Sequence, residues 1–392
     1  MTANITPREA SALQLTPRKH RIMIVAGEAS GDLHGAELAR EIVARDPDCE
    51  IFGIAGELMR SAGVRAIYRT DEIAGMGLTE LASTIRHTLS ALKNLRAILK
   101  RDKPDLLILI DFPDFNMRLA KTAKAAGVPV LYYIAPQVWA WRRGRIRKLI
   151  ERTDKIAVVL PFEAELYRAA GSRVAFVGHP LLDVIAPSPR AETLTRHGLA
   201  PDARLLAILP GSRRKEIRYL LEPMVAAARV LARAHGLIPC LALAQTLTVA
   251  DLEREGRVPL DGMRIIENDT YSIVAASEAA LVASGTATLE TALIGRPMVI
   301  AYKVSQLTWT AARLLVRGVN FAGMPNILAG REIVPELIQS QVTVANVVRA
   351  AERVLSEPYR SETVAALGEL KSRLGTPGAA ARVAQMALEM IA

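Results

Sequence analysis

The chain has 392 residues, and because a domain usually takes about 100–200 residues, this length predicts two domains. Apolar residues make up 51% of the chain, yet no stretch reaches the ~18 unbroken apolar residues that a membrane-spanning helix needs. The net charge of +10 favours a polyanionic neighbour, either nucleic acid or anionic lipid head groups, and charge alone does not choose between them.

The first 20 residues are polar and lack the apolar central segment of a signal peptide, so residues 1–20 are predicted to be a disordered lead-in. Cys49 and Cys240 each lie in an apolar, strand-like run, which indicates small core residues and argues against a disulfide framework. Together these features predict a cytoplasmic protein without structural disulfides.

From residue 21 to residue 186, short apolar runs alternate with amphipathic helical segments such as Gly35–Arg45 and Leu78–Lys100. The strands are expected at Arg21–Ala26, Glu50–Ala55, Asp105–Ile110, Val130–Ile134, Lys155–Leu160 and Arg173–Val177. Alternation of this kind predicts an α/β domain, in which helices cover both faces of a buried parallel sheet, as in Rossmann-like domains.

The alternation breaks at residues 187–202, where closely spaced prolines and polar residues predict a linker. It restarts in a second Rossmann-like domain at residues 203–375, and a C-terminal helix at residues 376–392 could return to the first domain. The second set of strands is expected at Leu205–Leu209, Ile238–Ala244, Met263–Ile266, Ala280–Ala283 and Met298–Tyr302. Open parallel sheets bind ligands beyond the carboxyl ends of their strands, so a cleft between the two domains is the expected site.

Two polar loops follow strands of the first domain. Gly27–Asp32 reads G-E-A-S-G-D, with His34 close behind; its glycines permit a tight turn and close approach of a ligand, although an ordinary turn capped by Asp32 explains the same residues. Asp111–Asn116 reads D-F-P-D-F-N directly after a very apolar strand. A half-desolvated carboxylate at Asp111 can have a raised pKa and act as a general base, whereas bracing of the loop is the alternative role.

Two further loops follow strands of the second domain. Pro210–Glu216 reads P-G-S-R-R-K-E; its glycine and serine can expose backbone N–H groups, and Arg213 can offer a fork of donors to a diphosphate. The alternative, a basic helix start, is electrostatically unusual. Ser284–Glu290 reads S-G-T-A-T-L-E, where a nucleotide could lie against the small residues and Glu290 could accept hydrogen bonds from ribose; a close-packed turn is the alternative.

Eight segments together resemble the lipid-A-disaccharide synthase family of GT-B glycosyltransferases in their order and spacing. The most specific are the W-A-W and P-N-I-L-A-G-R-E segments. The eight are Gly27–Asp32, Asp111–Asn116, Pro136–Trp141, Leu160–Glu163, Gly178–Pro180, Leu209–Arg213, Ser284–Glu290 and Pro325–Glu332.

This resemblance implies a GT-B fold and an inverting hexosyltransferase of lipid A and lipopolysaccharide biosynthesis. The donor would be UDP-2,3-diacylglucosamine and the acceptor 2,3-diacylglucosamine 1-phosphate (lipid X), giving lipid A disaccharide 1-phosphate and UDP. By the same resemblance, Asp111 is the catalytic base and Arg213 an essential phosphate-binding group. The nucleotide and diphosphate are expected at Gly211, Ser212, Arg213, Ser284, Gly285, Thr286, Glu290 and Asn326. The acceptor is expected at Gly27, Glu28, Ser30, Gly31, Asp32 and His34.

Both acyl-bearing substrates require access to a bilayer, and two basic segments are predicted to contact it. One starts near Met76 and continues into an amphipathic helix whose later turns fit packing on the sheet better. The other, residues 139–148, combines tryptophans suited to the head-group level with several cations. The predicted contacts are Met76, Leu78, Leu81, Trp139, Trp141, Arg142 and Arg143. The expected location is therefore cytoplasmic, peripheral on the anionic inner face of the inner membrane.

The second domain has no D-x-D placed like a metal site, and His and Cys do not cluster, so neither a metal nor another cofactor is expected. No recognisable nucleic-acid motif accompanies the basic charge, which argues against nucleic acid. The enzyme alternatives are a UDP-N-acetylglucosamine 2-epimerase and the muramyl-pentapeptide transferase. A non-catalytic lipid- or nucleotide-sugar-binding protein is a further alternative, against which the presence of both Asp111 and Arg213 speaks. The sequence leaves a homodimer open.

Overall fold

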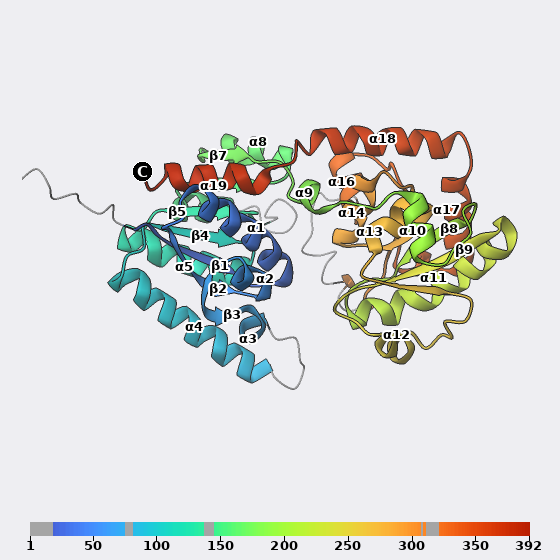
Figure 1. Ribbon diagram of the computed structural model, residues 1–392, viewed down its shortest axis with the longest axis horizontal. Helices are drawn as coiled ribbons and strands as arrows, with labels where there is room; N and C mark the ends of the chain where they lie inside the picture. Colours follow the sequence, from blue (N-terminus) through green and yellow to red (C-terminus); the bar gives the residue numbers. More distant parts are fainter. Residues whose placement is uncertain (1–18, 75–80, 137–144, 307–308, 311–320) are drawn as a thin grey trace, which may run out of the picture. The chain divides into compact units, whose positions relative to one another are not determined.

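The structure is a computed structural model that describes residues 19–74, 81–136, 145–306, 309–310 and 321–392. The chain divides into two compact units. Of the described residues, unit 1 comprises 19–74, 81–136, 145–177 and 378–392, and unit 2 comprises 178–306, 309–310 and 321–377. Each unit contains its own parallel sheet with helices around it (Figure 1). These two sheets confirm the predicted α/β fold class.

Unit 1 contains a seven-stranded sheet in the order β3-β2-β1-β4-β5-β6-β7, with parallel pairing throughout. Its strands are β1 (Arg21–Ala26), β2 (Glu50–Ala55), β3 (Arg65–Arg69), β4 (Leu106–Ile110), β5 (Val130–Tyr133), β6 (Lys155–Val158) and β7 (Val174–Phe176). Its helices are α1 (Ala29–Arg45), α2 (Glu57–Ser61), α3 (Thr70–Ala74), α4 (Leu81–Arg101), α5 (Pro113–Ala126), α7 (Arg145–Arg152), α8 (Pro161–Ala169) and α19 (Ala379–Glu389).

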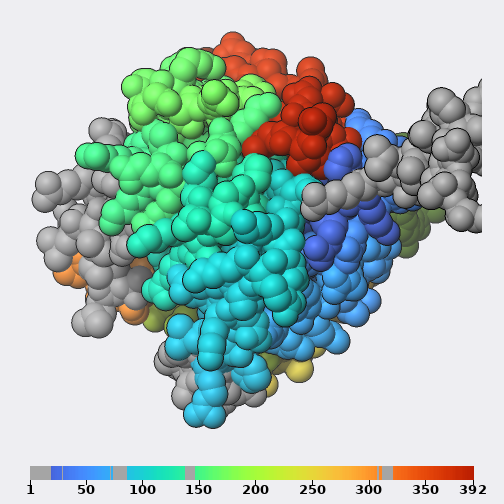
Figure 2. All heavy atoms as spheres, turned by 90° about the vertical axis from the view of Figure 1, so that its left-hand side faces the viewer, coloured from blue at the N-terminus to red at the C-terminus, as the bar shows by residue number. Residues whose placement is uncertain are grey.

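The core of unit 1 explains why its strands read as almost continuous apolar runs. All five residues of β4 are buried, as a strand covered on both faces requires. Leu95 of α4, Leu119 of α5 and Leu149 of α7 join one core cluster with the sheet. Helices α1 and α19 lie side by side (Figures 1 and 2).

Unit 2 contains a six-stranded parallel sheet in the order β10-β9-β8-β11-β12-β13. Its strands are β8 (Arg204–Leu209), β9 (Leu237–Leu243), β10 (Arg264–Glu267), β11 (Ser277–Ala283), β12 (Met298–Tyr302) and β13 (Glu336–Ile338). Its helices are α9 (Leu181–Val184), α10 (Arg190–Arg196), α11 (Arg214–His235), α12 (Val249–Gly256), α13 (Thr270–Ala276), α14 (Thr286–Ile294), α16 (Met324–Ala329), the 3-10 turn η1 (Gln339–Gln341), α17 (Val344–Leu355) and α18 (Tyr359–Arg373). Helices α11 and α17 pack together over the sheet and share its core cluster.

Two edge strands, β3 and β13, are absent from the sequence prediction. Both are only partly buried: β3 mixes arginines with apolar residues, and β13 has three residues, so neither gives a strong apolar run. Both cysteines are buried free thiols, as expected of core residues.

The boundary between the units differs from the predicted linker at 187–202. The units divide between Val177 and Gly178, and the proline-rich stretch instead leads into α10, with Pro189 at its N-cap. Proline is compatible with the start of a helix as well as with a linker, so the sequence alone does not distinguish the two. Helix α19 belongs to unit 1, where the Nε of Arg382 donates to the Val177 carbonyl at 2.8 Å.

Candidate active site

The loops that follow β1 and β4 meet at the centre of the sheet in unit 1, where the strand order reverses. Ala26 pairs with Ile110 at the carboxyl ends of these strands, so the two loops leave the sheet next to each other. A Cβ added to Gly27 would lie 2.2 Å from the ring of Phe112, so a larger residue there would displace the ring. Open parallel sheets bind ligands at such a reversal, which supports the predicted use of both loops.

The turn that contains Asp111 has a strained backbone, and side-chain hydrogen bonds hold its carbonyl group. Asp111 and Phe112 have φ angles of +47° and +46°, and such left-handed conformations cost residues with a side chain about 1–3 kcal/mol each. The carbonyl oxygen of Asp111 accepts hydrogen bonds from the Tyr132 hydroxyl at 2.6 Å and the Asn116 amide at 2.7 Å. The Asn116 amide also donates to the Ile110 carbonyl at 3.2 Å. Side chains of β5 and α5 therefore fix the backbone beneath the Asp111 carboxyl.

The Asp111 carboxyl lies in surroundings that raise its pKa. Its side chain is partly buried, and burial raises its pKa above the usual aspartate value. The nearby negative charge of Glu28 raises this pKa further, whereas a hydrogen bond from the Phe112 N–H lowers it. A carboxylate with a raised pKa is a stronger base once it is deprotonated.

Asp32, a predicted acceptor-side residue, instead caps a neighbouring helix. It is 6% exposed and accepts hydrogen bonds from the backbone N–H groups of Gly56, Leu58 and Met59 at 2.8, 2.9 and 3.1 Å. These donors lie at the start of α2, where N–H groups have no partner within the helix. Its carboxylate is therefore occupied in unit 1, which differs from the predicted contact with the acceptor.

The other residues of this loop surround the start of α1. Glu28 and Ser30 are exposed, and Gly31 packs against the side chain of Ala26. Burial lowers the pKa of His34 to about 4, so its imidazole is neutral at neutral pH. The Nδ1 of His34 is buried without a hydrogen-bond partner among the described residues. Of the predicted acceptor-side residues, Gly27 and Glu28 are thus brought to Asp111, whereas His34 is turned inward.

Unit 2 repeats this arrangement between β8 and β11, where its strand order reverses. Leu209 pairs with Val282 near the carboxyl ends of these strands. The loops that follow contain predicted nucleotide and diphosphate residues, Gly211–Arg213 after β8 and Ser284–Thr286 after β11. Gly285 and Thr286 are exposed. In both units, the loops singled out in the sequence lie where parallel sheets bind ligands.

The loop after β8 is closed by the Glu216 side chain. The backbone N–H groups of Ser212 and Arg213 donate to its Oε2 at 2.9 and 3.3 Å. Gly211 has φ +122°, and a Cβ there would lie 2.3 Å from the same oxygen, so this closure requires glycine. The N–H groups that the sequence analysis expects to be exposed are therefore satisfied, as in a capping box. The Arg213 side chain is 66% exposed, so most of its guanidinium faces solvent. One Nη lies 3.5 Å from the Oε1 of Glu216.

The loop after β11 begins with a fixed serine and leads to a held carboxylate. The Ser284 hydroxyl donates to the Ala322 carbonyl at 2.8 Å. Glu290 is partly buried and accepts a hydrogen bond from the Tyr271 hydroxyl at 3.0 Å. Burial raises the pKa of Glu290, and the bond from Tyr271 lowers it. Tyr271 therefore holds one oxygen of the carboxylate that is predicted to bind ribose.

Asn326, predicted to bind the nucleotide, is fully buried with its hydrogen-bonding capacity used. Its amide donates to the Val334 carbonyl at 2.8 Å and to Glu336 at 2.7 Å. Its oxygen accepts from the N–H groups of Ile333 and Val334 at 2.7 and 3.1 Å. Glu336 also accepts from the Ala322 N–H at 2.7 Å, so these side chains tie the β13 strand to the loop before α16. Asn326 organises this loop, which differs from the predicted direct contact.

The predicted membrane contacts lie largely outside the described residues. Those outside are Met76, Leu78, Trp139, Trp141, Arg142 and Arg143. Leu81 is the first residue of α4, and its side chain is not described.

Within the described ranges, no helix combines the length and apolar character needed to span a bilayer. In the same part of the chain, no three His, Cys, Asp or Glu side chains form a group that could hold a metal ion.

Four residues support the predicted ones in roles that the sequence did not predict: Tyr132, Asn116, Tyr271 and Glu216. Asn116 and Glu216 are the last residues of two of the motifs found in the sequence. A partial signal exists for three of them. Asn116 is a polar residue on the apolar face of α5, and Tyr132 carries a hydroxyl within an otherwise apolar strand. Glu216 lies three residues after Arg213, the spacing of a capping glutamate.

Solved structures that superpose on this chain include glycosyltransferases and UDP-sugar epimerases. The calicheamicin glycosyltransferase CalG4 superposes with a TM-score of 0.63 at 16% identity, covering 95% of this chain and 99% of that one. The UDP-GlcNAc 2-epimerase from Neisseria meningitidis, bound to UDP-GlcNAc, gives a TM-score of 0.62 at 12% identity, covering 94% and 100%. These likenesses show that the chain has the GT-B fold.

Sequence comparison narrows this fold class to one family. The family described as lipid-A-disaccharide synthetase matches residues 22–389. The lipid-A-disaccharide synthase of Syntrophus aciditrophicus is 46% identical over 376 residues, covering 94% of this chain and 97% of that protein. That of Geobacter metallireducens is 44% identical over 381 residues, covering 96% and 98%. The chain belongs to the lipid-A-disaccharide synthetase family, a glycosyltransferase family of lipid A biosynthesis.

Proposed function

We propose that this chain transfers the sugar of UDP-2,3-diacylglucosamine to lipid X, giving lipid A disaccharide 1-phosphate and UDP. The observation that carries the proposal is the family match over residues 22–389 in a chain with Asp111 at the sheet reversal of unit 1. The family indicates the reaction, and the loop offers a group that is suited to its proton transfer.

In the proposed reaction, the Asp111 carboxylate accepts the proton of the acceptor hydroxyl as the hydroxyl oxygen attacks the anomeric carbon. The new C–O bond forms on the side opposite the bond to UDP, which breaks, so the configuration inverts and UDP leaves with the electron pair. The raised pKa of Asp111 supports this role, because a stronger base shares the proton earlier in the attack. The braced backbone beneath it supports a fixed orientation of the carboxylate.

The departing diphosphate carries negative charge, and Arg213 is the proposed counter-charge in unit 2. Its guanidinium is exposed, whereas the neighbouring N–H groups are occupied by Glu216. The diphosphate is therefore proposed to bind the Arg213 side chain rather than the backbone N–H groups of this loop. Glu290, held by Tyr271, is the proposed acceptor for ribose hydroxyls, and the exposed residues Gly285 and Thr286 would lie along the nucleotide.

Mass spectrometry of the products tests this function. The purified full chain is incubated with UDP-2,3-diacylglucosamine and lipid X, and the disaccharide 1-phosphate and UDP are expected in equal amounts. UDP release without a disaccharide would contradict the transfer. Conversion of UDP-N-acetylglucosamine into its 2-epimer would instead favour the epimerase alternative.

The proposed location is the cytoplasmic face of the inner membrane, since both substrates carry acyl chains. The predicted apolar contacts Met76 and Leu78 support a peripheral attachment. Replacing both residues with serine should lower co-sedimentation with anionic vesicles and leave the circular dichroism spectrum unchanged. Equal sedimentation would remove these two residues from the proposal. A homodimer is compatible with this function, and sedimentation equilibrium distinguishes it from a monomer.

A further inference from the structure

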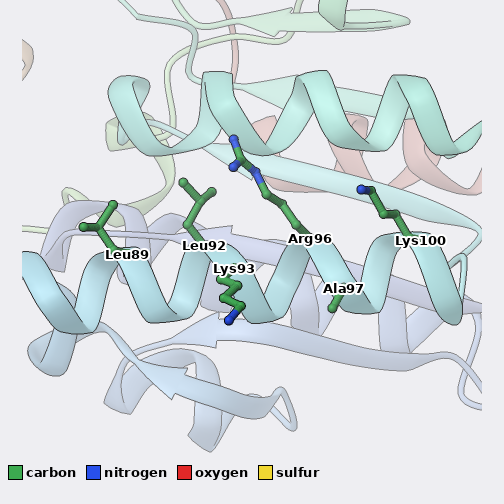
Figure 3. A pocket seen from close by; sticks show the side chains of 6 residues that line it. All are labelled: Leu89, Leu92, Lys93, Arg96, Ala97 and Lys100. Carbon is green, nitrogen blue, oxygen red and sulfur yellow. The ribbon is translucent and has the colours of Figure 1, made fainter.

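An open groove runs along the outer side of α4 in unit 1, away from the sheet reversal. Its volume is about 360 Å³, and its lining consists of apolar and cationic side chains: Leu89, Leu92, Lys93, Arg96, Ala97 and Lys100. Figure 3 shows Arg96 and Lys100 extending from α4 toward the neighbouring helix, with Lys93 on the other side of α4. The groove is therefore lined by three cationic side chains of α4.

Helix α4 and the helix α5 beside it contain few acidic residues. The 21 residues of α4 include no Asp or Glu, and α5, which packs beside it, has Asp114 as its one acid. Arg118 and Lys121 of α5 are exposed and add to the charge. Figure 2 shows α4 and α5, in cyan and teal, next to each other on one face of unit 1. Such a face attracts polyanions.

Arg96 has donors that its surroundings do not use. One Nη donates to the Arg118 carbonyl at a long 3.4 Å, and the Nε is buried with no partner among the described residues. The buried Nε is out of reach of a ligand from solvent, whereas the terminal N–H groups are held, among the described residues, only by this one long hydrogen bond. A phosphate matches the geometry of such terminal donors. Lys93 and Lys100 are exposed.

Leu89 distinguishes a lipid from other polyanions. Leu89 is 53% exposed at the N-terminal end of the row of cations, while Leu92, one turn further along α4, is buried and joins the core. A bilayer surface presents phosphates directly above apolar chains, so it can satisfy both the cations and an exposed leucine. Nucleic acid offers phosphates but no apolar partner for such a leucine.

We propose that this groove, lined by Leu89 to Lys100 of α4, binds the phosphodiester of an anionic bilayer phospholipid. Lys93, Arg96 and Lys100 contact the phosphate, and Leu89 lies against the glycerol and the first methylene groups. The inference rests on the proposed function only in that acyl substrates require a bilayer. Vesicle binding is measured without either substrate, so its failure is distinguishable from a failure of sugar transfer.

The test compares full-length variants in co-sedimentation with vesicles of phosphatidylcholine alone and with added phosphatidylglycerol. The groove variant carries Lys93→Gln, Arg96→Gln and Lys100→Gln. A matched control carries Arg233→Gln, Lys371→Gln and Arg373→Gln, three exposed cations of unit 2, so both lose the same net charge. Circular dichroism and sugar transfer in detergent micelles show whether each variant is folded and active.

The groove variant should lose roughly fivefold in partition coefficient per cation, hence about 100-fold in all, on phosphatidylglycerol vesicles. The matched control should lose much less, and phosphatidylcholine vesicles should bind all variants weakly. Equal losses in the two triple variants would reduce the effect to net charge and overturn the inference. Wild-type binding by the groove variant would overturn it as well.

A second variant separates a bilayer from nucleic acid. Leu89→Ser should lower vesicle binding by several-fold, whereas Val364→Ser, which changes a 43% exposed valine of α18, should not. Single-stranded RNA serves as the competing probe. If the groove variant lost RNA binding but kept vesicle binding, or if Leu89→Ser left vesicle binding unchanged, the phospholipid assignment would be wrong.

Discussion

The sheet reversals of the two units present opposite kinds of chemistry. In unit 1, Asp111 is partly buried on a strained backbone whose carbonyl is held by Tyr132 and Asn116. In unit 2, Arg213 is exposed at the end of a loop that Glu216 closes. The same topology thus carries a fixed acid–base group in one unit and an accessible charge in the other.

This difference follows from what each group is proposed to do. A base gains strength from lost hydration and from a fixed direction, and both come from packing. A counter-charge for a diphosphate must reach a large, hydrated anion, and a guanidinium on an exposed loop end does so with little desolvation of its own. We therefore expect substitutions in unit 1 to change turnover with little effect on nucleotide affinity, and those in unit 2 to change nucleotide affinity as well.

The largest expected effect is that of Asp111→Asn. Asparagine keeps the shape but removes the base, so turnover should fall by about 10²–10⁴-fold while UDP affinity changes little. Steady-state kinetics and calorimetry with UDP measure the two quantities. Asp114→Asn, an exposed carboxylate at the start of α5, is the matched control and should stay near normal. Near-normal turnover in a folded Asp111→Asn variant would move the base elsewhere, with Glu28, whose charge acts on Asp111, the first candidate.

Arg213→Ala should weaken both UDP binding and turnover, because the contact with the diphosphate exists before and during its departure. A charge-assisted hydrogen bond contributes about 1.5–3 kcal/mol, hence a roughly 10- to 100-fold loss of UDP affinity. Arg214→Ala is the control, since Arg214 is paired with Asp251 at 3.0 Å. Equal losses in the two variants would mean that general positive charge, rather than Arg213, holds the diphosphate.

Tyr271→Phe tests the held carboxylate of unit 2. Without the hydrogen bond from Tyr271, the Glu290 carboxylate is no longer held in one orientation. A hydrogen bond of this kind contributes about 0.5–1.5 kcal/mol, so UDP affinity should fall by roughly two- to tenfold. Calorimetry with UDP and with 2′-deoxy-UDP should show that the variant discriminates less between the two ligands. An unchanged preference for the ribose would assign Tyr271 to the packing of α13 alone.

The candidate loops could be found in the sequence because each follows an apolar run, whereas the strand order that places them at the reversals comes from the structure. Asp111 directly follows β4, whose residues are all buried, and Arg213 follows β8 by a few residues. A carboxylate at the end of a buried strand is visible without a structure. Its support is not: Tyr132 is 21 residues away along the chain and Asn116 lies on the next helix, and only folding brings both to one carbonyl oxygen.

The sequence could not separate ligand contacts from structural ones. Asp32 and Asn326 both belong to motifs of the family, yet backbone groups occupy them in the fold. The partners of Asp32 begin 24 residues further along, at Gly56, where α2 needs a cap. The same residue types, such as Asp and Asn, bind ligands in some places and satisfy buried N–H groups in others. Only their partners in the fold distinguish the two roles.

A smaller effect is expected from Glu28→Gln, through the pH dependence of turnover. The negative charge of Glu28 raises the pKa of Asp111, so its removal should lower that pKa. Because Asp111 acts as a base in its deprotonated form, the acidic limb of the kcat/KM profile should move to lower pH, by about one unit or less. The plateau at higher pH should not change. A limb that stays in place would show that Glu28 does not act on the catalytic group.

The smallest effect is expected from EDTA, which should leave turnover unchanged. The sequence has no D-x-D placed like a metal site in the second domain. The proposed transfer therefore neutralises the departing diphosphate with the Arg213 guanidinium, which already supplies a fixed positive charge. A magnesium ion would duplicate this charge, and its removal would then lower turnover in the wild type and lower it further in Arg213→Ala. Measuring both proteins with EDTA and then with added Mg²⁺ decides the matter, because a loss restored by Mg²⁺ would give the metal the role assigned here to Arg213.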